Sequence, residues 1–67
     1  MITIKVNDNT KQIQEQLTVA NLIDELKIQS NGIAIAINNS IVKKEDWHNV
    51  QVVNNDNILI IQSTQGG

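Results

Sequence analysis

The core of this chain has to be built almost entirely from aliphatic side chains, because its 67 residues include one Trp and no Phe, Tyr or Cys. A chain of this length makes one small domain, which buries only about 60% of the surface that its unfolded chain exposes. Without Cys it has no disulfide, no cysteine-ligated zinc site and no catalytic thiol. Its stability therefore depends on close packing of isoleucine-rich segments, and β-branched residues favour strands.

Charge and hydropathy argue against several classes of protein. The net charge is −2, and the basic residues are all Lys. We expect no nucleic-acid partner, since nucleic-acid-binding surfaces typically combine clustered Arg and Lys with aromatic residues that stack on bases. Glu45-Asp46 directly follows the one basic pair, Lys43-Lys44, which is typical of a solvated loop. No apolar run approaches the roughly 20 residues of a membrane span, and the first residues lack a signal-peptide pattern. We expect a cytoplasmic protein that has no membrane contact.

Alternation and turn residues together predict five strands. The strands are expected at residues 1–6, 11–14, 33–37, 41–42 and 58–61, where apolar residues alternate or run together. The turns between and before them are expected at residues 7–9, 38–40 and 54–57, which are rich in Asn and Asp. Residues 43–49, which include Trp47, are expected to form a loop or a single helical turn. Residues 50–53 are expected to be semi-extended.

One segment changes to helical spacing. Thr18 can cap a helix that begins at Val19 and runs to about Lys27. Its apolar stripe consists of Val19, Leu22, Ile23 and Leu26. The segment ends at Ser30-Asn31-Gly32, where Gly32 can take a left-handed conformation.

The resulting order β-β-α-β-β-β predicts an α+β fold. We expect a mixed sheet of about four or five strands with one helix packed on one face, and the first and last strands as parallel neighbours at its centre. This is the β-grasp, or ubiquitin-like, fold. The sequence predicts a single folded body over residues 1–61 and a flexible C-terminal tail over residues 62–67.

The chain ends in Gly66-Gly67, which supply two of its three glycines. At an average glycine usage of about 7%, roughly 0.5% of chains would end this way by chance. Glycine has no Cβ, so such a tail can enter a narrow channel and present its carboxylate. An ordinary disordered tail or an expression scar is the other interpretation, and the tail alone does not separate the two.

Three blocks of the sequence together resemble the ThiS family of ubiquitin-like sulfur carriers, which is related to MoaD. The blocks are Leu17-Thr18-Val19-Ala20 with Leu22-Ile23 and Leu26, then Ile33 to Asn38 with Ile41-Val42 and Trp47, then Asn55-Asp56 with Ile58 to Ile61 and Gly66-Gly67. The resemblance covers essentially the whole chain. It departs from the family pattern at Lys43, where Pro is usual, and at Asn55, where Gly is usual. Asn tolerates positive φ, so the turn at Asn55 can be kept.

The resemblance implies a function for the terminal carboxyl group, whose ordinary pKa of about 3.3–3.7 makes it an anion. Gly67, preceded by Gly66, would be adenylated by ATP on a ThiF-like enzyme and converted by a persulfide donor to a thiocarboxylate. A ThiG-like thiazole synthase would then take the sulfur for the thiazole ring of thiamine. The carrier would not be an enzyme, and it would bind no cofactor and no metal, since ATP is bound by the partner. His48 and the adjacent acidic pairs are expected to be surface residues.

A carrier also needs a surface on which its partners dock. In the last strand Leu59 and Ile61 share the face opposite Ile58 and Ile60. We expect Leu59 and Ile61, beside Thr3 and Lys5 of the first strand and with Gln65 of the tail, to form an exposed partner-binding face. The alternative is that Leu59 and Ile61 fill a secondary cluster against the loop around Trp47. Trp47 itself is expected to plug the edge of the core rather than to contact a partner.

Other functions remain open from the sequence. A MoaD-like carrier for molybdopterin synthesis has the same chemistry, although those chains are usually longer and richer in aromatic residues. A carrier for another sulfur pathway and a ubiquitin-like modifier of lysines are also compatible with the tail. A non-covalent β-grasp adaptor with an inert tail belongs to a different class. We expect a monomer, because the tail and one sheet face have to stay accessible.

Overall fold

The computed structural model describes residues 1–62, and residues 63–67 lie outside that part of the chain. Its elements are β1 (Ile2–Val6), β2 (Asn9–Ile13), α1 (Val19–Glu25), β3 (Ile33–Ile37), β4 (Ser40–Val42), the 3₁₀ helix η1 (Lys44–Asp46) and β5 (Asn57–Gln62). Strand β5 continues one residue past the expected end of the body at residue 61. The rest of the expected tail falls outside the described residues.

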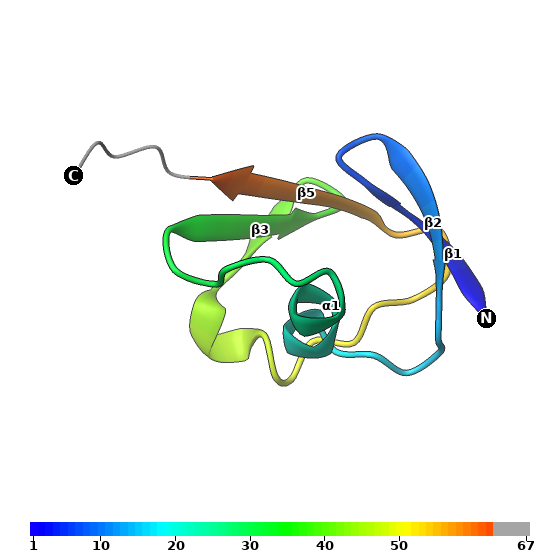
Figure 1. Cartoon of the computed structure of the whole chain (residues 1–67), viewed down its shortest axis with the longest axis horizontal. Helices are drawn as coiled ribbons and strands as arrows, with labels where there is room; N and C mark the ends of the chain where they lie inside the picture. Colours follow the sequence, from blue (N-terminus) through cyan, green and yellow to red (C-terminus); the bar gives the residue numbers. More distant parts are fainter. Residues whose placement is uncertain (63–67) are drawn as a thin grey trace.

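The five strands form one mixed sheet in the order β2-β1-β5-β3-β4. The first and last strands, β1 and β5, are parallel neighbours at its centre, and the other three pairs are antiparallel. Figure 1 shows the α-helix α1 lying against one face of this sheet. The β-grasp architecture expected from the sequence is confirmed.

Asparagine makes the tight turns of both hairpins. Asn7 and Asp8 join β1 to β2 with φ of 50° and 71°, and Asn38 and Asn39 join β3 to β4 with φ of 51° and 74°. Two-residue hairpin loops with positive φ at both positions match the twist of the flanking strands, and Asn and Asp tolerate that conformation. The strands therefore begin directly after these pairs, so β2 includes Asn9 and β4 includes Ser40, which the sequence had placed in turns.

The helix starts where expected and ends earlier than expected. The Asn21 N–H donates to Thr18 Oγ1 over 3.2 Å, and the Thr18 N–H donates to Asn21 Oδ1 over 3.2 Å, so the two residues cap the first turn reciprocally. The helix was expected to reach about Lys27, but it ends at Glu25, because Lys27 adopts a left-handed φ of 57°. Gly32 is also left-handed, with φ of 75°.

The core fills the space between α1 and the inner face of the sheet. Its buried residues come from every layer of the fold and are Ile4, Val6, Ile13, Val19, Leu22, Ile23, Ile35, Trp47, Val52, Ile58 and Ile60. Trp47 is 4% exposed, and its indole N–H donates to the Val42 carbonyl over 3.1 Å. The expectation that Trp47 plugs the core edge is confirmed.

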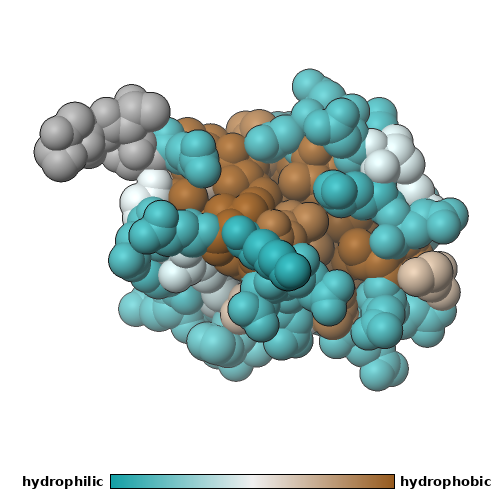
Figure 2. Space-filling model, viewed as in Figure 1, coloured by the Kyte–Doolittle hydropathy of each residue, from teal (hydrophilic) through white to brown (hydrophobic). Residues whose placement is uncertain are grey.

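The core is not fully covered. Figure 2 shows apolar side chains gathered across the middle of the molecule and bordered by polar ones. A hollow of about 460 Å³ opens between β2, β5 and the segment that follows α1, and its apolar lining consists of Val6, Leu26, Ile28 and Ile60. Leu26 is accordingly only half-buried, although the helical stripe predicted from the sequence includes it.

A buried carboxylate fastens the start of β5. Asp56 is 6% exposed, and its two oxygens accept hydrogen bonds from Asn38 Nδ2 over 3.0 Å and from the Val53 N–H over 2.9 Å. The Asn57 N–H donates in turn to Asn38 Oδ1 over 3.0 Å. This network joins the β3–β4 turn to β5. Asn55, next to Asp56, has φ of 73°. This turn therefore does require a left-handed residue, and Asn55 supplies it where the family usually has Gly.

Candidate functional site

The last strand presents an exposed apolar pair on the outer face of the sheet, the face opposite α1. Ile58 and Ile60 are buried beneath the helix, whereas Leu59 is 48% exposed and Ile61 is 46% exposed. The expectation that Leu59 and Ile61 are exposed is confirmed. The alternative, in which they pack against the loop around Trp47, is wrong, because Trp47 belongs to the core on the other side of the sheet.

Strand register places further apolar residues beside this pair. Leu59 pairs with Ala36, and Ile61 pairs with Ala34. Ala36 pairs on its other side with Ile41 of β4, which is 65% exposed. We call the resulting surface the apolar sheet face, and it consists of Ala34, Ala36, Ile41, Leu59 and Ile61. It contains a shallow depression of about 260 Å³ with Asn7, Asp8, Asn39 and Asn57 at its rim.

Thr3 and Lys5 lie on the same side of the sheet but not directly beside Leu59 and Ile61. Strand β1 pairs with β5 only through Lys5 with Asn57 and Val6 with Ile58, at the start of β5. Lys5 and Thr3 line a separate polar depression of about 250 Å³ with Thr10 and Asn57. The expected face therefore has two halves, a polar one over β1 and β2 and an apolar one over β3, β4 and β5.

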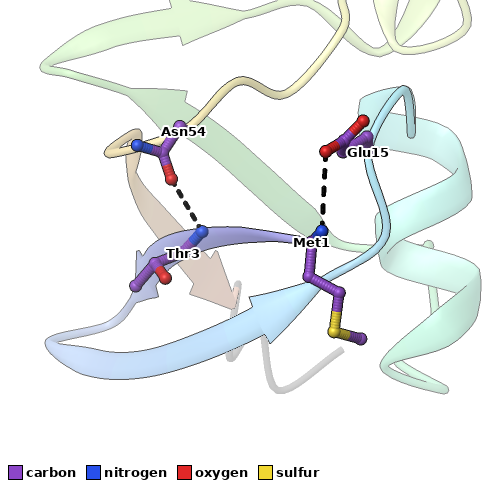
Figure 3. A network of polar contacts seen from close by, with 4 residues as sticks. All are labelled: Met1, Thr3, Glu15 and Asn54. Carbon is purple, nitrogen blue, oxygen red and sulfur yellow. Dashed lines mark hydrogen bonds and ion pairs between the residues drawn. The ribbon is translucent and has the colours of Figure 1, made fainter.

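Polar contacts hold the start of β1 in place. Figure 3 shows the Thr3 N–H donating to Asn54 Oδ1, over 2.9 Å, and the N-terminal ammonium group of Met1 pointing to Glu15. The Met1 nitrogen and Glu15 Oε2 are 3.5 Å apart, with both side chains largely exposed. Exposed ion pairs contribute little to stability, so the Asn54 contact is the more important of the two.

The terminal residues expected to carry the chemistry, Gly66 and Gly67, lie outside the described residues, as does Gln65. The last described residue, Gln62, pairs with Ile33 at the start of β3. Strand β5 therefore ends next to Ile61, at one end of the apolar sheet face. Five residues span at most about 17 Å, which sets the reach of the terminal carboxylate beyond Gln62.

The titratable side chains of the described residues are dispersed over the surface, apart from the buried Asp56. Within residues 1–62, no cluster of three or more His, Asp or Glu side chains is arranged to hold a metal ion. His48 and the pairs Asp24-Glu25 and Glu45-Asp46 are exposed, as expected of surface residues. In the same part of the chain, no helix has the length and hydropathy that crossing a membrane requires.

Sequence reasoning missed Ile41 and the two alanines of the apolar sheet face. The alternation in Ile33-Ala34-Ile35-Ala36-Ile37 already placed the alanines on one face. It did not say that Ile41 lies across from Ala36, because that depends on the two-residue turn at Asn38 and Asn39. A turn one residue longer would have directed Ile41 to the inner face.

The fold and this surface define a small ubiquitin-like β-grasp protein whose last strand leads from an apolar face to a Gly-Gly end. A model of the ThiS family matches residues 3–67, and the chain belongs to the ThiS family. It is 38% identical over 64 residues to the sulfur carrier protein ThiS of Escherichia coli (strain K12), covering 96% of this chain and 97% of that one. The family predicted from the sequence is confirmed.

The fold has also been seen in a crystal structure. The thiamine biosynthesis protein (ThiS) from Geobacter metallireducens superimposes with a TM-score of 0.88, covering 98% of this chain and 100% of that one. The two sequences are 22% identical, so this likeness bears on the fold alone.

Proposed function

We propose that this chain, a sulfur carrier of the ThiS family, holds its sulfur as a thiocarboxylate at Gly67 and delivers it to the thiazole ring of thiamine. The observation that carries the proposal is the extent of the family match, which runs through residue 67 and so includes Gly66-Gly67. The carrier is a protein substrate of other enzymes and not itself a catalyst.

The chemistry needs no catalytic side chain on the carrier. The Gly67 carboxylate attacks the α-phosphate of ATP and releases pyrophosphate, which leaves an acyl-adenylate. A persulfide sulfur displaces AMP to give an acyl disulfide. A thiol reductant then cleaves the S–S bond of this acyl disulfide and leaves the thiocarboxylate. A ThiF-like adenylating enzyme binds the ATP, and a ThiG-like thiazole synthase accepts the sulfur. We place these steps in the cytoplasm, where ATP and such partners are available.

The loading step is tested by intact mass. After incubation with ATP, a ThiF-like enzyme and a persulfide donor, the chain should gain about 16 Da, because one oxygen is replaced by sulfur. The matched control is the chain that lacks Gly67, which should gain nothing. An unchanged mass in the full chain would favour the alternative of a non-covalent adaptor with an inert tail.

The acceptor is tested separately from the loading. Disruption of the gene in its own host should create a growth requirement that the thiazole precursor relieves. A growth defect that appears instead only under conditions that require a molybdopterin enzyme would assign the chain to the MoaD-like pathway. The family match favours the thiazole pathway, since the matching model and the E. coli relative are both ThiS.

We further propose that the apolar sheet face contacts the adenylating enzyme. Leu59 and Ile61 stand on it at 48% and 46% exposure, and the chain continues from there to the reacting carboxylate. Exposed apolar side chains grouped on one surface are typical of an interaction site. The contact leaves Gly67 to reach into the active site of the partner.

The contact is tested with Leu59→Asp. A charge at an apolar contact should lower kcat/KM for adenylation at least about tenfold, mainly through KM. The matched control is Gln12→Asp, an exposed position in the polar half of the same side of the sheet. Equal adenylation of both folded variants would rule out the apolar sheet face as the contact.

A further inference from the structure

The turn that leads into β3 contains a reactive dipeptide, Asn31-Gly32. Of the ten asparagines in the sequence, Asn31 alone is followed by glycine. Both residues are exposed and lie in the turn before Ile33, the first residue of β3. We propose that Asn31 is a site of spontaneous deamidation, at which the folded protein acquires aspartate and isoaspartate. The reaction needs no partner, so the inference stands apart from the proposed function.

The chemistry requires the backbone nitrogen of Gly32 to attack the Asn31 side-chain carbonyl carbon. A new N–C bond closes a five-membered succinimide, and the amide nitrogen of Asn31 leaves as ammonia. Water then opens the ring at one of its two carbonyls, giving aspartate or isoaspartate. The net change is the exchange of NH₃ for H₂O, with no oxidant or reductant. Gly32 favours the attack because it has no Cβ to obstruct the approach.

Within the described residues, no hydrogen bond restrains the reacting groups. Within residues 1–62, neither the Asn31 side chain nor the Gly32 N–H takes part in a hydrogen bond. A side chain without such bonds can rotate to present its carbonyl carbon. The Gly32 N–H loses its proton in the reaction, but it has no hydrogen bond within residues 1–62 that would have to break first.

Other asparagines are held in place, which supplies the contrast. Asn38 donates to Asp56 and accepts from the Asn57 N–H. Asn7 donates to the Ile60 carbonyl over 3.3 Å and accepts from the Ile60 N–H over 2.8 Å. Asn21 accepts hydrogen bonds at the helix cap. Their side chains would have to break these bonds before reaching the geometry of attack.

The product would matter for the end of the sheet. Isoaspartate inserts one extra carbon into the main chain and adds a negative charge, two residues before Ile33. Ile33 is the pairing partner of Gln62, the last residue of β5. We therefore expect the pairing at the point where β5 ends to be weaker in deamidated molecules. Relative to the unmodified protein, amide exchange should accelerate more at Ile33 and Gln62 than at Ile35.

The test follows the purified protein during incubation at mildly alkaline pH, in buffer and in urea. Peptide mapping should find a gain of about 1 Da at Asn31 before any other asparagine, with isoaspartate as one product. Because the fold does not restrain Asn31, its rate in buffer should lie within about threefold of its rate in urea. Asn38 should react measurably only in urea.

Two variants complete the test. Asn31→Gln, which keeps Gly32 and its backbone conformation, should abolish the early product. Gly32→Ala should slow it by at least about tenfold in urea, where the positive φ of the folded turn is irrelevant. The inference is overturned if another asparagine reacts first in buffer, or if folding protects Asn31 by more than about tenfold.

Discussion

At the scale of single residues, asparagine does in this chain what glycine does in many others. Within residues 1–62, seven residues other than glycine have positive φ, and Asn7, Asn38, Asn39 and Asn55 are four of them. Asn populates this region at lower cost than other residues that carry a Cβ. A chain with one glycine before its terminal pair can therefore still form two tight hairpins and the turn before β5.

Asp56 is the polar residue on which the start of β5 most depends. Asp56→Ala should lower the free energy of unfolding by about 1–3 kcal/mol, because it leaves the Val53 N–H and the Asn38 amide without their acceptor. Urea unfolding monitored by Trp47 fluorescence measures the loss. The control Asp24→Ala, at an exposed position, should change stability by less than about 0.5 kcal/mol. Equal losses would show that the Asp56 network contributes nothing specific.

At the scale of elements, starts were easier to predict than ends. Thr18 before an apolar stripe marks the beginning of α1, because a hydroxyl that caps the first turn is a local signal. The end of α1 has no such signal. Gly32 is left-handed, as the sequence suggested, but Lys27 is left-handed as well, and nothing local distinguishes this Lys from one inside a helix. Ile28, directly after this left-handed residue, packs partly buried against the core, a tertiary contact that local propensity does not show.

The helix cap is itself a prediction at this scale. Thr18→Ala should lower the free energy of unfolding by about 0.5–2 kcal/mol, because it removes the acceptor of the Asn21 N–H. Thr18→Ser should restore most of this stability, since it returns the hydroxyl. Thermal unfolding by circular dichroism measures both. A Ser variant as unstable as the Ala variant would assign the effect to the lost methyl group and its packing.

The apolar sheet face was predictable only in part, for a reason that belongs to sheets. Alternation along one strand identified Leu59 and Ile61, because that pattern is local. Whether Thr3, Lys5 or Ile41 lies beside them depends on which strands pair and in what register. β1 pairs with β5 through two residues only, whereas β3 pairs with it along five. As a result, the residues beside Leu59 come from β3 and β4 and not, as expected from the sequence, from β1.

At the scale of the whole molecule, the outer face of the sheet, opposite α1, has a polar half and an apolar half. Its half over β1 and β2 carries Thr3, Lys5, Thr10 and Gln12, and its half over β3, β4 and β5 is the apolar sheet face. The main core cluster lies on the other side, and Ala36 is the one buried residue of the apolar half. Strand β5 ends at Gln62, beside Ile61, so the proposed docking surface lies next to the last described residue.

This division predicts which distant residues act together. Ile41→Asp should reduce kcat/KM for adenylation by at least about tenfold, although Ile41 is on a different strand from Leu59, because both flank Ala36. Since Ile41 is 65% exposed, the unfolding free energy should change by less than about 0.5 kcal/mol. The double variant with Leu59→Asp should lose less than the sum of the two single losses, as residues of one contact surface do. Thr10→Asp, in the polar half, is the control. If Thr10→Asp impairs adenylation and Ile41→Asp does not, the enzyme contacts the polar half, and the apolar sheet face has another use.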